Sequence, residues 1–424
     1  MKMNCSENDK IFEKLLNHEI SIAVVGIGYV GYPLVQLLSQ KFKVIAYDID
    51  EERVSQLKVD NALFTCCESD MKKAAIYIIT VPTPINKDMS PNLSDLIQAT
   101  SSVARCIDKG NIIIYESTVA PGTTEGLCKE NLEKLSGLIC DEDFFLAYSP
   151  ERVSPGVDRA TIKQIDKVVS ASTEETLCLV SKIYQEIIES RVIEVSSIKI
   201  AEAAKMVENI QRDVNIALMN ELSTIFFNTE IDFREVLDAA STKWNFMNVR
   251  PGFVGGHCIG VDPYYFIDYT KRRNMNAKLI ELSRVINESE VAFVSNLVNE
   301  FVNKHDNQKT RIGIFGISYK ENVGDIRNSK MIDLCNHVLK SNTFDISIVD
   351  FDVPIGKCSK EIEKHRIFEL SNEIFDIIVI GNDHDSFGKI EKKWSSMVHP
   401  NSRIIDLTGK FEHLFSLDTE YYHL

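Results

Sequence analysis

The sequence is short of positive charge. Its 424 residues carry 47 Lys and Arg against 62 Asp and Glu, which gives a formal net charge of −15. Nucleic acids and anionic membranes attract proteins through basic surfaces, so this balance argues against a general nucleic-acid binder or a membrane-surface protein. Any anionic ligand must therefore be held by local positive groups.

Long apolar runs are also missing. No stretch approaches the roughly 18 consecutive apolar residues of a membrane span, and residues 1–19 lack the apolar core of a secretory signal. We therefore expect a cytoplasmic protein with no membrane-bound part.

Paired cysteines are absent as well. The 10 cysteines include no C-x-x-C pair, and the 9 histidines are scattered. This pattern predicts free thiols in a reducing compartment and no metal site. The length allows about two or three domains with substantial cores.

The first positive pattern is a β-α-β unit. Gly26-x-Gly28-x-x-Gly31 follows an apolar strand and opens a helical stretch, and a second strand ends in Asp48. This order is typical of a dinucleotide site, with a tight turn at Gly26, pyrophosphate close to Gly28 and close helix packing at Gly31. Asp48 can accept hydrogen bonds from ribose hydroxyls and repel a 2′-phosphate. We therefore predict NAD rather than NADP.

Three further apolar strands end in polar residues. They are 75–79 before Thr80-Val81-Pro82-Thr83-Pro84, 112–115 before Glu116-Ser117-Thr118, and 144–148 before Ser149-Pro150-Glu151-Arg152. Open parallel sheets bind ligands at the carboxyl ends of their strands. We therefore predict that Pro82, Thr83, Thr118 and Glu151 line one crevice.

A stretch from about Ile200 to Asn228 contains neither Pro nor Gly. Apolar residues recur with helical spacing at Ile200, Ala203, Val207, Ile210, Val214 and Ala217. This predicts one continuous amphipathic helix with a buried apolar stripe. On another face, Lys205, Asn209 and Arg212 can project into one space. They are either a solvated polar face or donors to a developing negative charge.

Near the middle of the chain, a single cysteine lies in a glycine-rich loop. The loop runs Gly255-Gly256-His257-Cys258, and Asp262 follows four residues after the cysteine. Glycines let a substrate approach a thiol closely, and Asp262 could move a proton. A cysteine is more often a small buried hydrophobic residue, so the loop alone leaves both interpretations open.

The last region repeats the strand-to-glycine and strand-to-acid pattern. Apolar strands at 311–316, 345–350, 376–381 and 402–406 predict a second, smaller α/β domain after a polar linker at 303–309. Lys320 and Arg327 lie between the first two of these strands and could be ordinary surface charges.

In their order, these motifs resemble the UDP-sugar 6-dehydrogenases from Ser21 to about Leu407. The loop from His257 to Tyr265 is similar to the branch that acts on UDP-N-acetylhexosamines. Ser241–Phe246 and Arg250–Gly252 are similar to UDP-N-acetylglucosamine 6-dehydrogenases of the Vi-polysaccharide type.

The resemblance implies an activity and an assembly. NAD would accept four electrons in two steps from the C6 alcohol of a UDP-N-acetylhexosamine, and UDP-N-acetylglucosamine is the first choice. Cys258 would form a thiohemiacetal and then a thioester, and the acid would supply polysaccharide synthesis. The partners implied are the UDP-sugar substrate and a second copy of the chain, in a homodimer formed through the long helix.

The resemblance also implies roles for individual residues. Those implied in catalysis are Cys258, Lys205, Asn209, Asp262, Glu151 and Thr118. Those implied in cofactor binding are Gly26, Gly28, Tyr29, Val30, Gly31, Asp48, Arg53, Pro82, Thr83, Ser117, Thr118 and Arg327. Those implied in substrate binding are Glu151, Arg152, Lys205, Asn209, Arg212, Arg250, Gly255, His257 and Lys320.

The expected fold class is α/β, with two Rossmann-like domains of parallel sheets joined by a central helical domain that contains the long helix. The expected parts are an N-terminal extension (1–20), an NAD-binding domain (21–198), a central domain with the cysteine loop (199–302) and a UDP-sugar-binding domain (303–424).

Alternatives remain open. The N-acetylhexosamine could be the galacto or the manno epimer. A single-hydride dehydrogenase of the hydroxyacid type leaves Cys258 without a role, and a sensor without catalysis is a further alternative. One departure concerns residues 242–246, where many members of the N-acetylhexosamine branch have an arginine that crosses a subunit boundary. This chain lacks that arginine, and Lys243 or Arg250 could substitute for it.

Overall fold

The computed structural model describes residues 5–152, 162–229, 231–304, 309–340, 344–370, 373–415 and 419–424. The chain forms two compact units. The first comprises residues 1–208 and 264–275, and the second comprises residues 209–263 and 276–424. This division does not test the four parts predicted from the sequence, which stay predictions. Most of the predicted linker, at 305–308, lies outside the described residues.

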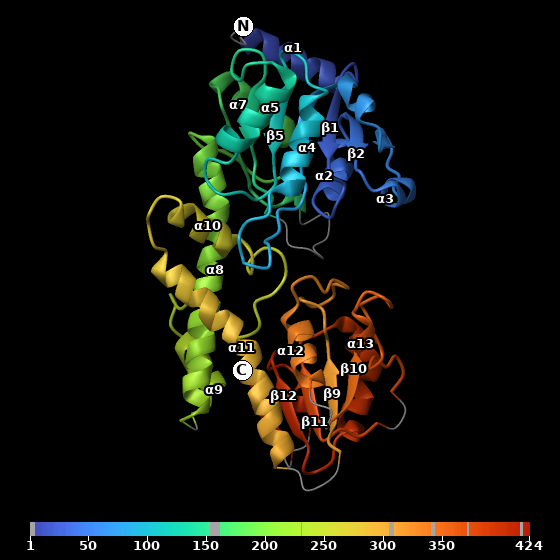
Figure 1. Cartoon of the computed structure of the whole chain (residues 1–424), viewed down its shortest axis with the longest axis vertical. Coiled ribbons are helices and arrows are strands. Elements are labelled where there is room, and N and C mark those ends of the chain that lie inside the picture. The colour runs from blue at the N-terminus through green and yellow to red at the C-terminus, as the bar shows by residue number, and fades with distance from the viewer. Residues whose placement is uncertain are drawn as a thin grey trace. The chain divides into compact units, whose positions relative to one another are not determined.

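Within the described residues, the first unit contains an eight-stranded sheet in the order β3-β2-β1-β4-β5-β6-β7-β8. Figure 1 labels β1, β2 and β5 of this sheet. The strands are β1 (Ser21–Val25), β2 (Lys43–Tyr47), β3 (Ala62–Thr65), β4 (Ala74–Ile79), β5 (Ile112–Tyr115), β6 (Phe145–Tyr148), β7 (Lys167–Ala171) and β8 (Val192–Glu194). The strands from β3 to β6 are parallel, as predicted. β7 pairs antiparallel with β6, which the sequence did not predict.

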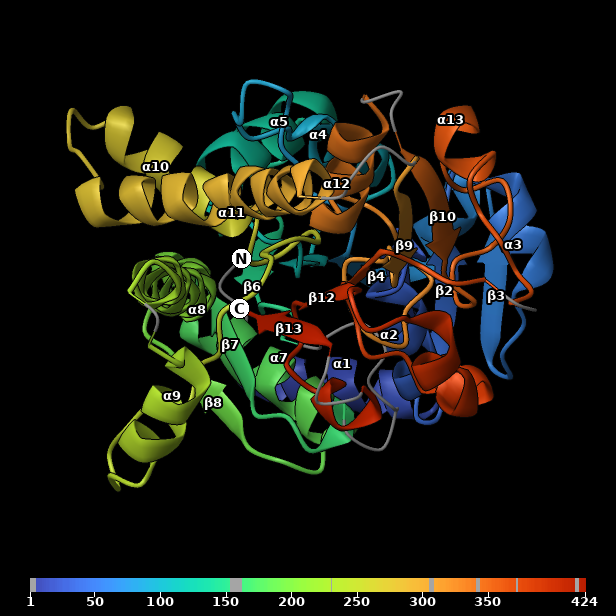
Figure 2. The ribbon, with the colours of Figure 1, turned by 90° about the horizontal axis from the view of Figure 1, so that it is seen from below.

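Helices cover both faces of this sheet (Figure 2). They are α1 (Cys5–Leu16), α2 (Gly31–Leu38), α3 (Glu51–Gln56), α4 (Ser94–Ala104), α5 (Lys129–Ser136) and α7 (Glu174–Gln185), with the short helical segments η1 (Glu68–Lys73) and η2 (Thr124–Cys128). Side chains alternate along β1, so Ala23 and Val25 pack with α4 and α5 while Ile22 and Val24 pack with α2 and α7. A sheet buried on both faces explains its nearly continuous apolar strands.

The second unit contains a five-stranded parallel sheet in the described chain, in the order β10-β9-β11-β12-β13. Its strands are β9 (Arg311–Phe315), β10 (Asp345–Val349), β11 (Ile377–Ile380), β12 (Arg403–Asp406) and β13 (Glu420–His423). Its helical segments are α9 (Phe233–Ser241), α11 (Lys278–Asn303), α12 (Lys330–Leu339), α13 (Lys360–Glu363), η3 (Asp385–Met397) and η4 (Glu412–Leu414). The two Rossmann-like sheets confirm the predicted fold class.

The predicted long helix is present as α8 (Ile198–Phe227), but its burial differs from the prediction. Within the chain, Ile200 is 47% exposed and Val207 57% exposed, whereas Ala217 is buried, so the predicted apolar stripe is buried only in part. The buried face also contains polar side chains, among them Glu202, Asp213 and Asn220. Periodicity located the helix correctly, but its assignment of Ile200 and Val207 to the core of the chain is wrong.

The segment before Ser21, for which the sequence gave no role, forms α1 and packs on α7. Leu15 is fully buried in the core of the first unit. The Phe12 and Phe42 rings lie 6.5 Å apart, and Lys182 Nζ lies 2.6 Å from Asp9 Oδ1. The extension is therefore part of the folded unit.

Leu15→Ala is expected to lower the free energy of unfolding by about 2–4 kcal/mol, because it leaves a cavity in a packed core. Glu13→Ala, at an exposed position of the same helix, is expected to change it by less than about 0.5 kcal/mol. Urea denaturation followed by circular dichroism measures both. Equal midpoints for the two variants would show that α1 does not contribute to the core.

Candidate active site

In the turn after β1, Gly26 and Gly31 are closely packed, whereas Gly28 has open space beside it. A Cβ at Gly26, whose φ is +91°, would lie 2.7 Å from Val81 Cγ1, and one at Gly31 would lie 1.9 Å from Gly26 O. Packing therefore requires glycine at both places. A Cβ at Gly28 would have Arg53 Nη1 as its nearest neighbour, at 3.8 Å. The space beside Gly28, at the start of α2, is suited to a pyrophosphate.

Asp48 lies at the carboxyl end of β2, beside this turn. Its Oδ2 accepts a hydrogen bond from Ile27 N at 2.7 Å, and Arg53 Nη1 lies 3.8 Å from the same oxygen. The carboxylate is fixed in place and keeps lone pairs for ribose hydroxyls. Tyr29 and Val30 lie in the same turn. The residues present therefore fit NAD.

The loops after β4 and β5 are joined by hydrogen bonds. Thr83 Oγ1 donates to Thr118 O at 2.7 Å, and Ser117 Oγ donates to Val81 O at 2.7 Å. The predicted residues Pro82, Thr83, Ser117 and Thr118 thus lie together at the carboxyl edge of the sheet, where a dinucleotide is expected.

Glu151 follows β6 and belongs to a buried charged cluster. Lys167 Nζ lies 3.1 Å from Glu116 Oε2 and 3.3 Å from Glu151 Oε2, and Tyr184 donates a hydrogen bond to Glu116. Burial, opposed by the Lys167 charge, raises the pKa of Glu116 to about 7. Sequence reasoning missed Lys167 and Tyr184, because only the antiparallel pairing of β7 with β6 brings Lys167 to this edge.

Arg152, predicted to bind substrate, makes contacts within the protein. Its Nη2 lies 2.7 Å from Glu208 Oε1, and its Nη1 donates to Asp166 O at 3.0 Å. The guanidinium is 28% exposed. Its role towards a substrate stays a prediction.

α8 carries Lys205 and Asn209 one turn apart. Lys205 is buried, Asn209 is half-buried and Arg212 is exposed. Asn209 Nδ2 donates to Asp262 Oδ2 at 2.5 Å, which joins two of the predicted catalytic residues within the second unit. Arg212 is therefore less shielded from water than the other two.

Cys258 lies in a loop whose backbone is fixed by α10 (Asp262–Lys271). Its carbonyl oxygen accepts hydrogen bonds from Val261 N at 3.0 Å and Asp262 N at 2.8 Å. The thiol is half-buried, and its Sγ lies 3.3 Å from His257 Nδ1. A thiol that keeps solvent access and has an imidazole beside it is suited to act as a thiolate nucleophile.

The glycines before Cys258 allow a close approach to the segment after β9. A Cβ at Gly255 would lie 2.6 Å from Asn328 O, and one at Gly256, where φ is +75°, would lie 2.6 Å from Tyr319 Cδ2. Gly256 N donates to Asn328 O, and Asn328 Nδ2 donates back to Gly256 O at 2.8 Å. The thiol loop is thus bound to the second Rossmann-like domain.

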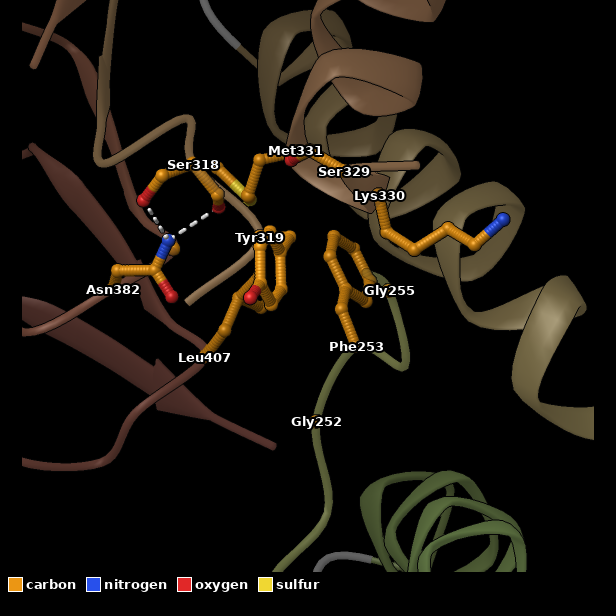
Figure 3. A pocket seen from close by; sticks show the side chains of 11 residues that line it. Gly252, Phe253, Gly255, Ser318, Tyr319, Ser329, Lys330, Met331, Asn382 and Leu407 are labelled. Carbon is orange, nitrogen blue, oxygen red and sulfur yellow. Dashed lines mark hydrogen bonds between the residues drawn. The ribbon is translucent and has the colours of Figure 1, made fainter. Parts of the chain in front are cut away.

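A cavity of about 160 Å³ lies between this loop and the carboxyl ends of β9, β11 and β12 (Figure 3). Its lining residues are Gly252, Phe253, Gly255, Ser318, Tyr319, Ser329, Lys330, Met331, Gly381, Asn382 and Leu407. Asn382 Nδ2 donates to Ser318 O at 2.6 Å, which fixes one wall. The Tyr319 hydroxyl is buried without a hydrogen-bond partner. The two aromatic rings, Phe253 and Tyr319, and the Tyr319 hydroxyl are suited to a planar base with polar edges.

Of the remaining predicted residues of this unit, Arg250 and Arg327 are exposed and Lys320 is half-buried. Arg327 Nη2 lies 2.5 Å from Asp325 Oδ2, and Lys320 follows Tyr319 directly. Arg250, 48% exposed, pairs with Asp238 at 2.9 Å. Arg250 thus has an acidic partner within its own chain.

Asp350, Asp352 and His384 form a group of three possible metal ligands in the described chain. Asp350 accepts hydrogen bonds from Ile317 N and Val353 N, and His384 Nδ1 accepts one from Asn322 N. The cluster therefore stabilises the loops after β9 and β10, and this structural role explains its presence.

Within the described ranges, none of the helices combines the length and the apolar character that a membrane span requires.

Comparison with protein families gives three matches in a row. Residues 60–188 match the NAD binding domain of the UDP-glucose/GDP-mannose dehydrogenase family, residues 199–289 match its central domain, and residues 313–413 match its UDP binding domain. The match confirms the NAD cofactor and indicates a UDP-sugar substrate.

Individual relatives agree with this assignment. The chain is 40% identical to the UDP-N-acetyl-D-glucosamine 6-dehydrogenase of Pseudomonas aeruginosa over 87% of this chain and 92% of that protein. It is 39% identical to protein CapL of Staphylococcus aureus over 92% and 96%, respectively. The solved structure of a UDP-D-ManNAc dehydrogenase from Pyrococcus horikoshii matches with a TM-score of 0.83 and 28% identity, over 95% of this chain and 99% of that one. The resemblance inferred from the motifs is confirmed, and the chain belongs to the UDP-glucose/GDP-mannose dehydrogenase family.

Proposed function

We propose that this enzyme oxidises the C6 alcohol of a UDP-N-acetylhexosamine to the uronic acid, with UDP-N-acetylglucosamine as the preferred substrate and polysaccharide synthesis as the destination of the product. The main observation behind this proposal is the half-buried thiol of Cys258, whose carbonyl oxygen accepts a hydrogen bond from Asp262 N, while the Asp262 carboxylate binds Asn209. The choice of sugar rests on relatives. Those named UDP-N-acetyl-D-glucosamine 6-dehydrogenase are 38–40% identical to the chain, and one named UDP-N-acetyl-D-mannosamine dehydrogenase is 30% identical.

The proposed reaction removes four electrons. NAD, bound twice in succession, supplies the hydride acceptor for both oxidations. After the first oxidation, the Cys258 thiolate attacks the C6 aldehyde and forms a thiohemiacetal. The second oxidation converts this adduct to a thioester. Water then attacks C6, the C–S bond breaks, and the acid leaves as the thiolate returns.

The proposed roles of the other residues follow from their chemistry. Lys205 and Asn209 stabilise negative charge on the substrate oxygen, where one such donor contributes about 3 kcal/mol. Asp262 exchanges the proton of this oxygen with water. Glu151, with Thr118, organises the water for thioester hydrolysis.

We propose a division of labour between the parts of the chain. Residues 21–198 bind NAD, residues 199–302 carry the thiol loop, and residues 303–424 bind the UDP-sugar. In the last part, the cavity beside Tyr319 and Asn382 receives the uracil base, because aromatic rings and an amide can recognise its face and its edge.

UDP-N-acetylmannosamine is the second candidate substrate. Two solved structures of proteins named UDP-N-acetylmannosamine dehydrogenase match 95% of this chain, with TM-scores of 0.83 and 0.80. The two sugars differ in configuration at C2.

We expect purified protein with NAD and UDP-N-acetylglucosamine to yield about two NADH per sugar, because each C6 alcohol passes through two oxidations. The gluco, galacto and manno epimers, together with UDP-glucose, form the panel. Absorbance at 340 nm gives the NADH yield, and mass spectrometry identifies the acid. A higher kcat/KM with the manno epimer would replace the preferred substrate with the second candidate. Only one NADH per sugar would remove the four-electron proposal.

Cys258→Ser is expected to lower the steady-state rate at least about a hundredfold and to leave a burst near one NADH per sugar, because an alkoxide is a poor substitute for the thiolate. Rapid-mixing absorbance at 340 nm measures both quantities. The matched control is Cys178→Ser, at a half-buried thiol of α7, which should retain normal turnover. Unimpaired two-NADH turnover in Cys258→Ser would exclude the nucleophile role.

We also propose that α8 forms a homodimer interface. Val207, Leu218 and Ile225 are 57%, 49% and 50% exposed, and together with Ile200 they recur at spacings of 7 and 11 residues, which place them on one face of a helix. Such an apolar stripe on the surface of a chain is typical of a protein interface.

Leu218→Glu is expected to convert a dimer, at twice the chain mass of 48.0 kDa, to a monomer, because it buries a charge in an apolar contact. Light scattering coupled to gel filtration measures the mass. Ile355→Glu makes the same kind of change at an apolar residue that is 76% exposed in the second sheet domain, and it should leave the mass unchanged. A monomeric wild-type protein would contradict this interface.

A further inference from the structure

Several elements of the first unit bring charged side chains together around Glu151. Lys167 is the first residue of β7, Glu116 follows β5, and Tyr184 lies on α7. Lys167 Nζ lies 3.1 Å from Glu116 Oε2, 3.3 Å from Glu151 Oε2 and 3.5 Å from Pro150 O. The ammonium group therefore has an acceptor in reach for each of its three protons.

Solvent exposure within the cluster increases from Glu116 through Lys167 to Glu151. The side chains of Glu116, Lys167 and Glu151 are 0%, 9% and 17% exposed. A buried ammonium needs carboxylate partners to remain charged, and Glu116 is an inner partner that no solvent reaches. Tyr184 donates a hydrogen bond to Glu116, and its ring centroid lies 5.1 Å from Lys167 Nζ. These contacts hold the ammonium in place from the interior side.

We propose that Lys167 is a positioning residue, which holds Glu151 ionised and in one orientation so that its carboxylate aligns the hydrolytic water. This inference rests on the proposed function, in which Glu151 serves the breakdown of the Cys258 thioester. In that step, the water oxygen bonds to C6 and its proton passes to Glu151. The C–S bond breaks, and the electron pair returns to the sulfur of Cys258. No oxidant or further reactant is needed.

The rest of the cluster fits this role. Backbone Arg152 N donates to Glu151 Oε1 at 2.8 Å, while Lys167 approaches Oε2, so both carboxylate oxygens are oriented. A general base must be held within hydrogen-bond reach of its proton, and small displacements of such a group lower the rate strongly. A lysine that served only to neutralise Glu116 would not need to reach the more exposed Glu151.

Protonation of Glu116 is expected to make the rate of thioester hydrolysis depend on pH. The groups that face it are Lys167 from β7, Glu151 after β6 and Tyr184 from α7. Burial raises the pKa of Glu116 to about 7. Below that pH Glu116 is neutral, and Lys167 pairs with Glu151 alone. Above it a second negative charge is present, which makes Glu151 a stronger base. Hydrolysis should therefore accelerate as the pH rises through neutrality.

A double-mutant cycle tests the proposal in the full-length enzyme. Glu151→Gln is expected to lower kcat about a hundredfold, and Lys167→Met at least about tenfold. Because Lys167 acts through Glu151, the double variant should be no slower than Glu151→Gln within about threefold. Lys167→Arg, which keeps the charge, should recover part of the loss. Steady-state NADH production with UDP-N-acetylglucosamine gives kcat, and circular dichroism confirms that each variant is folded.

The outcomes separate the inference from the function on which it rests. Wild-type kcat in Glu151→Gln would overturn the role of Glu151 and, with it, the inference. If Glu151→Gln is slow but Lys167→Met is at wild-type rate, or the two losses multiply, the inference alone fails.

If Lys167→Met does not fold, the dependence of kcat on pH in two other variants tests the proposal. Glu116→Gln should abolish the rise of kcat near neutral pH. Tyr184→Phe should shift this rise to higher pH, because the Tyr184 hydrogen bond lowers the pKa of Glu116. Unchanged pH profiles in both variants would overturn the proposal.

Discussion

The hydrogen bond between Asn209 and Asp262 is the contact on which the thiol loop depends. It joins α8 to the first residue of α10, and the backbone N–H of Asp262 in turn binds the carbonyl oxygen of Cys258. The orientation of the cysteine backbone therefore follows from one amide and one carboxylate. On the other side, Gly255 and Gly256 press against the segment after β9, where a side chain would collide. The backbone of the thiol loop is held from both sides, and Cys258 itself stays half-buried.

Buried polar groups extend this support through the second unit. Arg284, 2% exposed, binds Asp213 at 2.5 Å, and Asn287 Nδ2 donates to the same carboxylate at 2.7 Å. Asn220 Nδ2 donates to Asn287 Oδ1 and to the carbonyl oxygen of Gly252, and Asn220 Oδ1 accepts a hydrogen bond from Gly252 N. Apolar side chains at these buried positions would carry a smaller desolvation penalty on folding than this polar network. The contact between Asn220 and Gly252 fixes the segment that leads to Phe253, which lines the cavity, and to the thiol loop.

Motifs with a local cause were predictable from the sequence. The glycines after β1 and Asp48 follow from local spacing, whereas the thiol loop was ambiguous by itself and was interpreted only together with the other motifs. Lys167 was not predictable, because its contact with Glu151 depends on β7 running antiparallel to β6, and no short-range pattern reports strand direction. The same limit hid Tyr184 on α7. Contacts made across a sheet need the topology first.

The predicted burial of α8 is wrong at Ile200 and Val207, and this error has a physical explanation. A period of 3.6 locates an apolar face, but it does not say whether that face meets the core of its own chain or another molecule. Here the inward face carries Glu202, Lys205 and Asp213, each buried. The same helix buries Ala201, Met206 and Ala217 but leaves Val207 and Leu218 exposed, so only part of its apolar surface packs within the chain.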